Sequence, residues 1–309
     1  MRSILSLLFL LFSVYGFPQI AEYVYRTPGD STYNCYLTVK PETGILRGLV
    51  VRDYTSLPDL SKKSPYQWQE LLLEKGLMVL YTCTTEDFPE LFFTDNGPSL
   101  MDEMIEEVLV KYSIPRNNIF VGGISASGTR ALRYTQYCLE GKSKFGHHVK
   151  AAFVVDSPLD MERFYLSATQ NRDHFKDGML WEAHHMKPYF EKHFNGTSKE
   201  RPEQYRSASV YSWNSENGGN AKHFSRLPLL IYHEPDMDWW INERGAHYFD
   251  INSFDLAGFT NQLRLLGNNQ VELITTTGKG FDREGNRKCH SWTIVDESYL
   301  ANWLTGYIE

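Results

Sequence analysis

The sequence of 309 residues lacks the features of proteins that bind nucleic acid or a metal ion. Asp and Glu number 38 against 31 Lys and Arg, which gives a net charge of −7, and no block of basic residues occurs. We therefore expect no nucleic-acid partner. The four cysteines form no CxxC motif, and the pairs His147-His148 and His184-His185 have no cysteine or carboxylate at ligand spacing. We expect no metal and no cofactor.

Long apolar runs are also absent, except at the N-terminus. Arg2 precedes an apolar stretch over residues 4–14, and a cleavage position follows Gly16. This order is typical of a secretory signal peptide, and the run is shorter than the roughly 20 residues of a membrane span. We predict a signal peptide over residues 1–16 and an exported (periplasmic or secreted) domain over residues 17–309, without stable membrane insertion after cleavage. An uncleaved anchor is the alternative. Export leaves the cysteines open as free thiols or as one or two disulfides.

Strand-like and helix-like segments alternate along the remaining chain, and no repeat or linker divides it. Residues 77–83 are apolar without alternation, as in a strand buried on both faces. Residues 99–112 have apolar side chains at helical spacing, and Ser99 with Asp102 is placed as a capping box. The alternation predicts a mainly parallel, twisted sheet flanked by helices, after an antiparallel lead-in at residues 23–26 and 33–40. The other expected strands are 46–52, 118–121, 150–155, 227–232 and 270–276, and the other expected helices are 66–75, 129–139, 256–266 and 292–304.

One segment is too long for this alternation of strands and helices. Residues 157–226 place about seventy residues between two expected strands, far more than a plain crossover needs. The segment is rich in aromatic side chains and in helix-like sequence. We interpret it as a helical cap over the ends of the strands. The alternative is a surface insertion that does not contact the functional site.

The most informative motif lies between an expected strand and an expected helix. Residues 122–128 read GGISASG, so Ser125 has glycine two positions before it and small residues after it. Such a sharp turn exposes a serine hydroxyl at the carboxyl end of a strand, and the next helix directs its free N–H groups to the same place. The motif therefore indicates a nucleophile. A phosphate-binding loop is excluded because no lysine follows Gly128, and Ser127 is the weaker nucleophile because it lacks the upstream glycine.

A serine nucleophile needs a histidine base and a carboxylate that orients the histidine. His290 lies just before the last expected helix, and Asp236 and Asp238 follow the strand over residues 227–232. Asp236 lies at the usual distance along the chain beyond a strand end. We therefore predict the triad Ser125, Asp236 and His290, with Asp238 as the alternative acid. Asp156, directly after the strand over residues 150–155, is a further candidate.

The glycine-flanked serine turn, an aspartate after the penultimate strand and a histidine before the last helix together resemble the α/β-hydrolase superfamily. The strings Glu234-Pro235-Asp236 and His290-Ser291-Trp292 are similar to those of uncharacterised secreted bacterial members. The resemblance covers the chain from about residue 45 to its end. It implies an α/β-hydrolase fold in which Ser125 attacks an acyl carbonyl, His290 moves the proton and Asp236 holds the imidazole.

Two positions depart from the family pattern. Ser127 stands where a glycine is usual. The loop Asp53-Tyr54-Thr55, which should supply an oxyanion donor, contains no glycine. We expect the Ala126 N–H as one donor and the Tyr54 backbone or hydroxyl as the other.

The sequence thus favours an exported serine hydrolase that cleaves a carboxylic ester through an acyl-enzyme, with a small-molecule or polymer-linked ester as substrate. A peptidase of the prolyl-oligopeptidase type is one alternative, although the chain has no room for the propeller domain expected there. A non-catalytic binding protein that retains the hydrolase fold is the other, since a fold alone does not guarantee activity.

Overall fold

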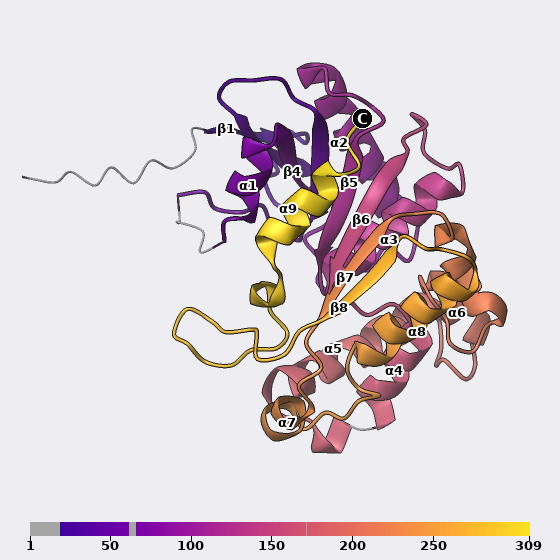
Figure 1. Ribbon diagram of the computed structural model, residues 1–309. Coiled ribbons are helices and arrows are strands. Elements are labelled where there is room, and N and C mark those ends of the chain that lie inside the picture. The colour runs from indigo at the N-terminus through magenta and orange to yellow at the C-terminus, as the bar shows by residue number, and fades with distance from the viewer. Residues whose placement is uncertain (1–18, 62–65, 171) are drawn as a thin grey trace, which may run out of the picture.

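A computed structural model describes residues 19–61, 66–170 and 172–309, so the predicted signal peptide lies outside the described residues. The centre of the molecule is an eight-stranded sheet in the order β1-β2-β4-β3-β5-β6-β7-β8 (Figure 1). Strands β1 and β2 pair antiparallel, β2 joins β4 antiparallel, and the other neighbours are parallel. The strands are β1 (Gln19–Tyr25), β2 (Cys35–Pro41), β3 (Gly48–Asp53), β4 (Leu77–Cys83), β5 (Ile119–Ile124), β6 (Val149–Val155), β7 (Leu229–His233) and β8 (Val271–Thr275).

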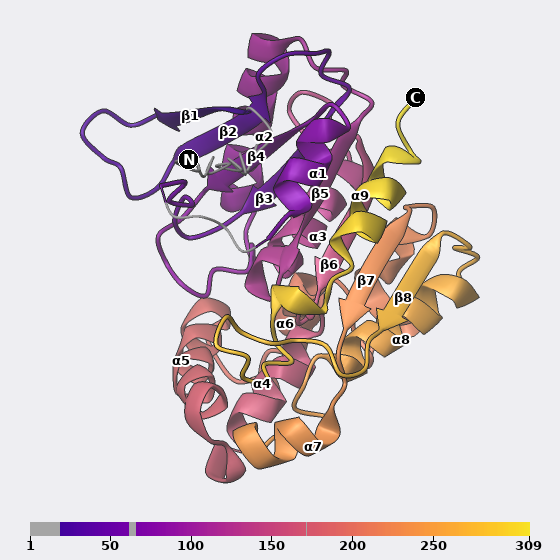
Figure 2. The ribbon, with the colours of Figure 1, turned by 60° about the vertical axis from the view of Figure 1, so that its left-hand side comes forward.

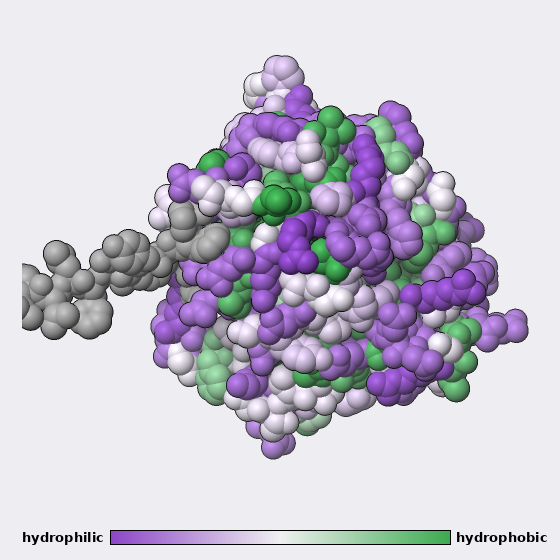
Figure 3. Space-filling view, turned by 45° about the horizontal axis from the view of Figure 1, so that its top comes forward, coloured by the Kyte–Doolittle hydropathy of each residue, from purple (hydrophilic) through white to green (hydrophobic). Residues whose placement is uncertain are grey.

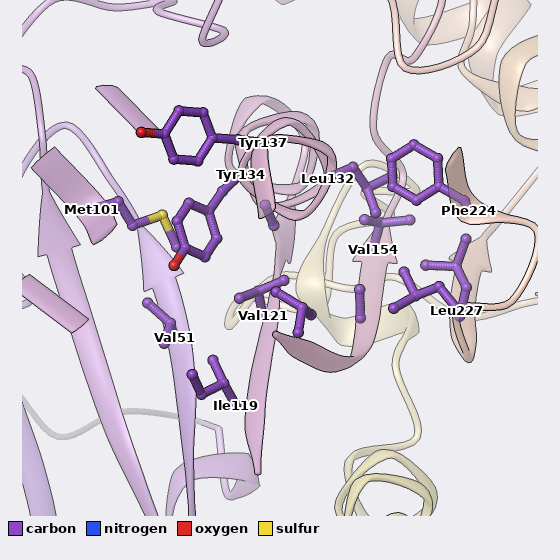
Figure 4. Close-up of a cluster of buried hydrophobic side chains, with 14 of the residues drawn as sticks. Val51, Met101, Ile119, Val121, Leu132, Tyr134, Tyr137, Val154, Phe224 and Leu227 are labelled. Carbon is purple, nitrogen blue, oxygen red and sulfur yellow. The ribbon is translucent and has the colours of Figure 1, made fainter. Parts of the chain in front are cut away.

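Helices cover both faces of the sheet. Helices α1 (Trp68–Glu74) and α9 (Glu297–Thr305) pack on one face, and α2 (Asn96–Tyr112), α3 (Ala126–Leu139) and α8 (Ser253–Leu265) pack on the other. Figure 4 shows the second interface, where Val51, Val121 and Val154 of the sheet meet Leu132 and Tyr134 of α3. The central strands are buried on both faces because apolar helix surfaces lie against each of them. The predicted mainly parallel sheet with an antiparallel lead-in is confirmed.

Two helix predictions need correction. Helix α2 begins at Asn96, so Ser99 lies inside the helix and does not cap it. The buried Asp102 carboxylate instead accepts hydrogen bonds from Nδ1 of His147 at 2.8 Å and from the Ser143 hydroxyl at 2.8 Å. The expected helix over residues 292–304 is divided into a short 3-10 turn, η4 (Trp292–Ile294), and α9. Asp296 separates them because its side chain caps α9 by accepting from the Tyr299 N–H.

The long segment between β6 and β7 is helical. It contains α4 (Met161–Gln170), η1 (Arg172–His174), α5 (Asp177–Phe194), α6 (Pro202–Ala208) and η2 (Glu216–Phe224). Figure 2 shows α4 and α5 below the arrowheads of β7 and β8, together with α7 (Met237–Trp239), which η3 (Trp240–Arg244) continues. These helices share their own apolar core, in which Phe190 and Tyr205 stack. They therefore lie at the carboxyl ends of the parallel strands.

Figure 3 shows hydrophilic side chains over most of one face, with apolar ones in small scattered groups. Within residues 19–61, 66–170 and 172–309, no helix is long and apolar enough to cross a bilayer. All four cysteines are free thiols.

Candidate active site

Ser125 occupies a strained turn between β5 and α3. Its backbone has φ 55° and ψ −133°, which is rare for a residue other than glycine. The turn is held by the Ser125 N–H, which donates to the Val155 carbonyl at 2.9 Å. A Cβ atom at Gly123 would lie 2.6 Å from the Ser127 carbonyl carbon, and one at Gly128 would lie 2.9 Å from the Gly123 oxygen. Both glycines are therefore required by the close approach of strand and helix.

Ser127, which replaces the glycine usual at this position, has a structural role. Its side chain is buried, and its hydroxyl donates to the Asp53 carbonyl at 2.6 Å. The bond joins the first turn of α3 to the end of β3. Arg130, one turn later in α3, forms a buried ion pair with the Asp53 carboxylate at 3.2 Å. Ser127 thus fixes the helix behind Ser125, which accounts for the departure from glycine.

The histidine of the site is held by Asp156 and not by Asp236. Nδ1 of His290 donates to Oδ2 of Asp156 at 2.7 Å. The predicted pairing of Asp236 with His290 is wrong, because the loop after β7 turns at once into α7 and Asp236 caps that helix. Asp236 accepts from the Trp239 N–H at 3.1 Å and from Arg287 at 2.9 Å. Asp238, the alternative acid, is an exposed residue of α7.

Asp156 follows β6 directly and is fully buried with φ 45°. Its Oδ1 accepts from Nδ1 of His233 at 3.1 Å and from the Asn252 side-chain amide at 3.1 Å. Nε2 of His233 contacts the Ser253 hydroxyl. An ionised carboxylate only accepts hydrogen bonds, so Nδ1 carries the proton in both His233 and His290. The carboxylate is therefore fixed by a second histidine and an amide that the sequence analysis missed, although His233 ends a strand at the same edge of the sheet.

The electrostatics keep Asp156 ionised and His290 basic. Burial alone would raise the pKa of Asp156, but the two neighbouring imidazoles outweigh it and hold that pKa well below its ordinary value. Burial acts to lower the pKa of His290, and the charge and hydrogen bond of Asp156 raise it above its ordinary value. With Nδ1 bonded to the carboxylate, the remaining nitrogen, Nε2, is available as a base.

The loop that carries His290 is anchored by Glu234, the residue after β7. Its buried carboxylate accepts from Arg287 at 2.6 Å and from the Gly278 N–H at 2.8 Å. The Thr276 hydroxyl also donates to it. Glu234 and Asp236, the carboxylates that follow β7, therefore both bind Arg287. Arg287 lies three residues before His290, so these contacts anchor the loop of His290.

The predicted oxyanion donors differ in their availability. The Ala126 N–H is the first of α3 and has no acceptor within its helix. The Tyr54 N–H donates to the Thr82 carbonyl at 2.9 Å, so the prediction of Tyr54 as a backbone donor is wrong. The backbone pairing of β3 with β4 continues through Tyr54, so this N–H is not available to a substrate oxygen. The Tyr54 hydroxyl stays a predicted donor.

Two cavities meet at His290 and Lys288. The smaller one, of about 180 Å³, also contains Ser125 and Ala126. Its walls are mostly apolar. Phe88 and Leu91 come from the loop between β4 and α2, and the helices beyond the strand ends supply Phe164, Met179, Met186 and Trp240. Phe164 and Met179 belong to α4 and α5, so the segment between β6 and β7 contacts the site and the alternative of a remote surface insertion is excluded. The second cavity, of about 640 Å³, extends from His290 toward β3 and α1.

No protein-family model matches the chain, and no curated protein matches it in sequence. Solved structures share its fold. An esterase from Pseudomonas putida aligns at 14% identity over 95% of this chain and 84% of its own, with a TM-score of 0.55. A fungal esterase from Rhizomucor miehei aligns at 12% identity over 94% and 85%, with a TM-score of 0.55. An acylaminoacyl peptidase from Pyrococcus horikoshii aligns at 16% identity over 95% of this chain, with a TM-score of 0.53, but this chain spans only 40% of the peptidase.

The chain has the α/β-hydrolase fold. In its α/β-hydrolase sheet, Ser125 follows β5, Asp156 follows the adjacent strand β6, and His290 lies on the loop after β8. All three therefore lie at the carboxyl edge of the sheet, where ligands of open α/β sheets bind.

Proposed function

We propose that the chain is a serine hydrolase that cleaves carboxylic esters through an acyl-enzyme formed on Ser125. The observation that carries this proposal is the hydrogen bond from His290 to Asp156, made beside a strained serine that lines the same cavity. A protonated Nδ1 leaves Nε2 free to accept a proton, which is the state that a general base requires.

In the proposed first step, Oγ of Ser125 attacks the acyl carbonyl as its proton passes to Nε2 of His290. The Ala126 N–H faces the negative charge that develops on the carbonyl oxygen. The C–O bond to the alcohol then breaks, and His290 returns the proton to the departing oxygen. A water molecule repeats the sequence on the acyl-enzyme, so that a carboxylic acid leaves and Ser125 regains its proton.

The small apolar cavity favours a short acyl group, because about 180 Å³ beside Ser125 leaves little room for a long chain. Esterases are among the structural neighbours at nearly full length. Amide cleavage is the second candidate, since peptidases also share the fold. We also propose that the protein is exported, because the sequence of residues 1–16 has the pattern of a signal peptide.

A fluorophosphonate probe tests the nucleophile. We expect it to label the wild-type chain and Ser127→Gly but not Ser125→Ala, because Ser125, unlike Ser127, lines the small cavity with His290. p-Nitrophenyl acetate and the matching acetanilide then compare ester with amide cleavage. Labelling of Ser125→Ala would contradict the assignment. Absence of labelling in every variant would favour a binding protein.

A further inference from the structure

Arg52, at the end of β3, is a buried cation without a carboxylate partner among the described residues. Its exposed fraction is 4%, and its Nε has no hydrogen-bond partner. The other deeply buried arginines are paired: Arg130 with Asp53 at 3.2 Å and Arg163 with Asp255 at 2.5 Å. Burial of an unpaired charge is costly, so a structure that keeps one needs a compensating interaction.

Three aromatic rings supply part of that compensation. The guanidinium carbon of Arg52 lies 4.3 Å from the ring centroid of Trp292, 4.7 Å from that of Trp68 and 5.0 Å from that of Tyr54. Rings attract the cation through their faces, and the Tyr54 hydroxyl also accepts a hydrogen bond from Arg52, but Nε has no partner. The guanidinium is thus held in place with donor capacity left over.

Arg52 and its three rings line the second cavity, which we call the arginine cavity. The same cavity is lined by His290 and by Ile124, the residue before Ser125. It therefore connects Arg52 with the proposed catalytic centre, and it shares His290 and Lys288 with the small apolar cavity. Lys288 and Arg283 add positive charge to its wall, while Asp59 and Glu70 line it as well.

We propose that the arginine cavity binds a carboxylate on the leaving group of the substrate, with Arg52 as its bidentate partner. A guanidinium edge matches a carboxylate through two parallel hydrogen bonds. The leaving group is assigned to the arginine cavity because the acyl group is proposed to occupy the smaller cavity beside Ser125. The inference rests on the proposed ester hydrolysis and narrows its substrates to short acyl esters of hydroxy acids.

Acetyl esters of matched shape test the inference. We compare kcat/KM for 4-acetoxybenzoate with that for 4-acetoxybenzamide, in the wild-type chain and in Arg52→Met. We expect the wild type to prefer the carboxylate and Arg52→Met to lose about 10- to 100-fold on the carboxylate alone, as for a hydrogen bond to a charged group. Arg52→Lys should recover only part of the loss, because an ammonium lacks the planar pair of donors.

Arg283→Met is the matched control, since it removes an exposed positive charge from the same cavity. It should keep the preference nearly unchanged. An equal preference in wild type and Arg52→Met, or a preference lost in Arg283→Met instead, would overturn the inference. A stronger preference for 4-acetoxyphenyl phosphate, or for a phenyl ester whose carboxylate is on the acyl group, would also overturn it. Fluorophosphonate labelling of each variant separates failure of the inference, with labelling intact, from failure of the proposed hydrolase activity.

Discussion

Replacing Asp156 with asparagine separates the two aspartates that compete for the role of the acid. Asn tolerates the positive φ of 45° at this position, so the backbone need not change. The carboxylate accepts on both oxygens, from His290 on one and from His233 and Asn252 on the other. An amide has only one oxygen, so its NH₂ group must face one of these donors. If it faces His290, the imidazole proton moves to Nε2 and the base is lost.

We therefore expect Asp156→Asn to lower kcat for p-nitrophenyl acetate by about 10⁴-fold, the loss typical of the wrong histidine tautomer in a serine triad. Asp236→Asn is the matched control and should stay within about tenfold, because its side chain caps α7 and contacts Arg287. Thermal unfolding of both variants checks that the fold is kept. A folded Asp236→Asn that loses turnover, beside an active Asp156→Asn, would refute the reasoning.

Three further predictions concern the same site. In the proposed mechanism the neutral form of His290 is the active one, and its pKa is raised by Asp156. We therefore expect kcat/KM to fall as the pH decreases through a value above 6.5. A fall centred at or below 6.5 would contradict the coupling to Asp156. Gly123→Ala would place a Cβ 2.6 Å from the Ser127 carbonyl carbon, so calorimetry should show a clear loss of stability and the fluorophosphonate reaction should slow. Wild-type stability and labelling would contradict the need for glycine at this position. Ser127→Gly should lose about 0.5–1.5 kcal/mol of unfolding free energy, because its hydrogen bond to Asp53 is lost. Urea titration measures this difference. A stability equal to that of the wild type would show that the bond does not stabilise the fold.

Much of the fold could be predicted because its signals are local. Apolar runs such as residues 77–83 match β4 at both ends, and the antiparallel lead-in pairs as expected. The turn at Ser125 was recognisable because glycine is required within three residues of it on either side. His290 was predicted as the base from its place between the last strand and the last helix, and it lines the same cavity as Ser125.

The acid could not be chosen in this way. Asp156, Asp236 and Asp238 all follow strands that end at the same edge of the sheet, so sequence position leaves them nearly equivalent. Only the fold shows that Asp236 caps α7 and contacts Arg287, whereas Asp156 bonds Nδ1 of His290. The capping box at Ser99 failed because α2 begins at Asn96, and the Asp102 carboxylate binds His147 instead.

The sequence alone determined the order of strands and helices, the strained serine turn and the histidine near the C-terminus, because each depends on neighbours along the chain. The tertiary structure alone decided that Asp156 holds His290, 134 residues away, and that Trp68, Trp292 and Tyr54 enclose Arg52. A hydrogen bond or a ring contact between distant segments depends on how loops pack at the edge of the sheet, and no local pattern of residues encodes that packing.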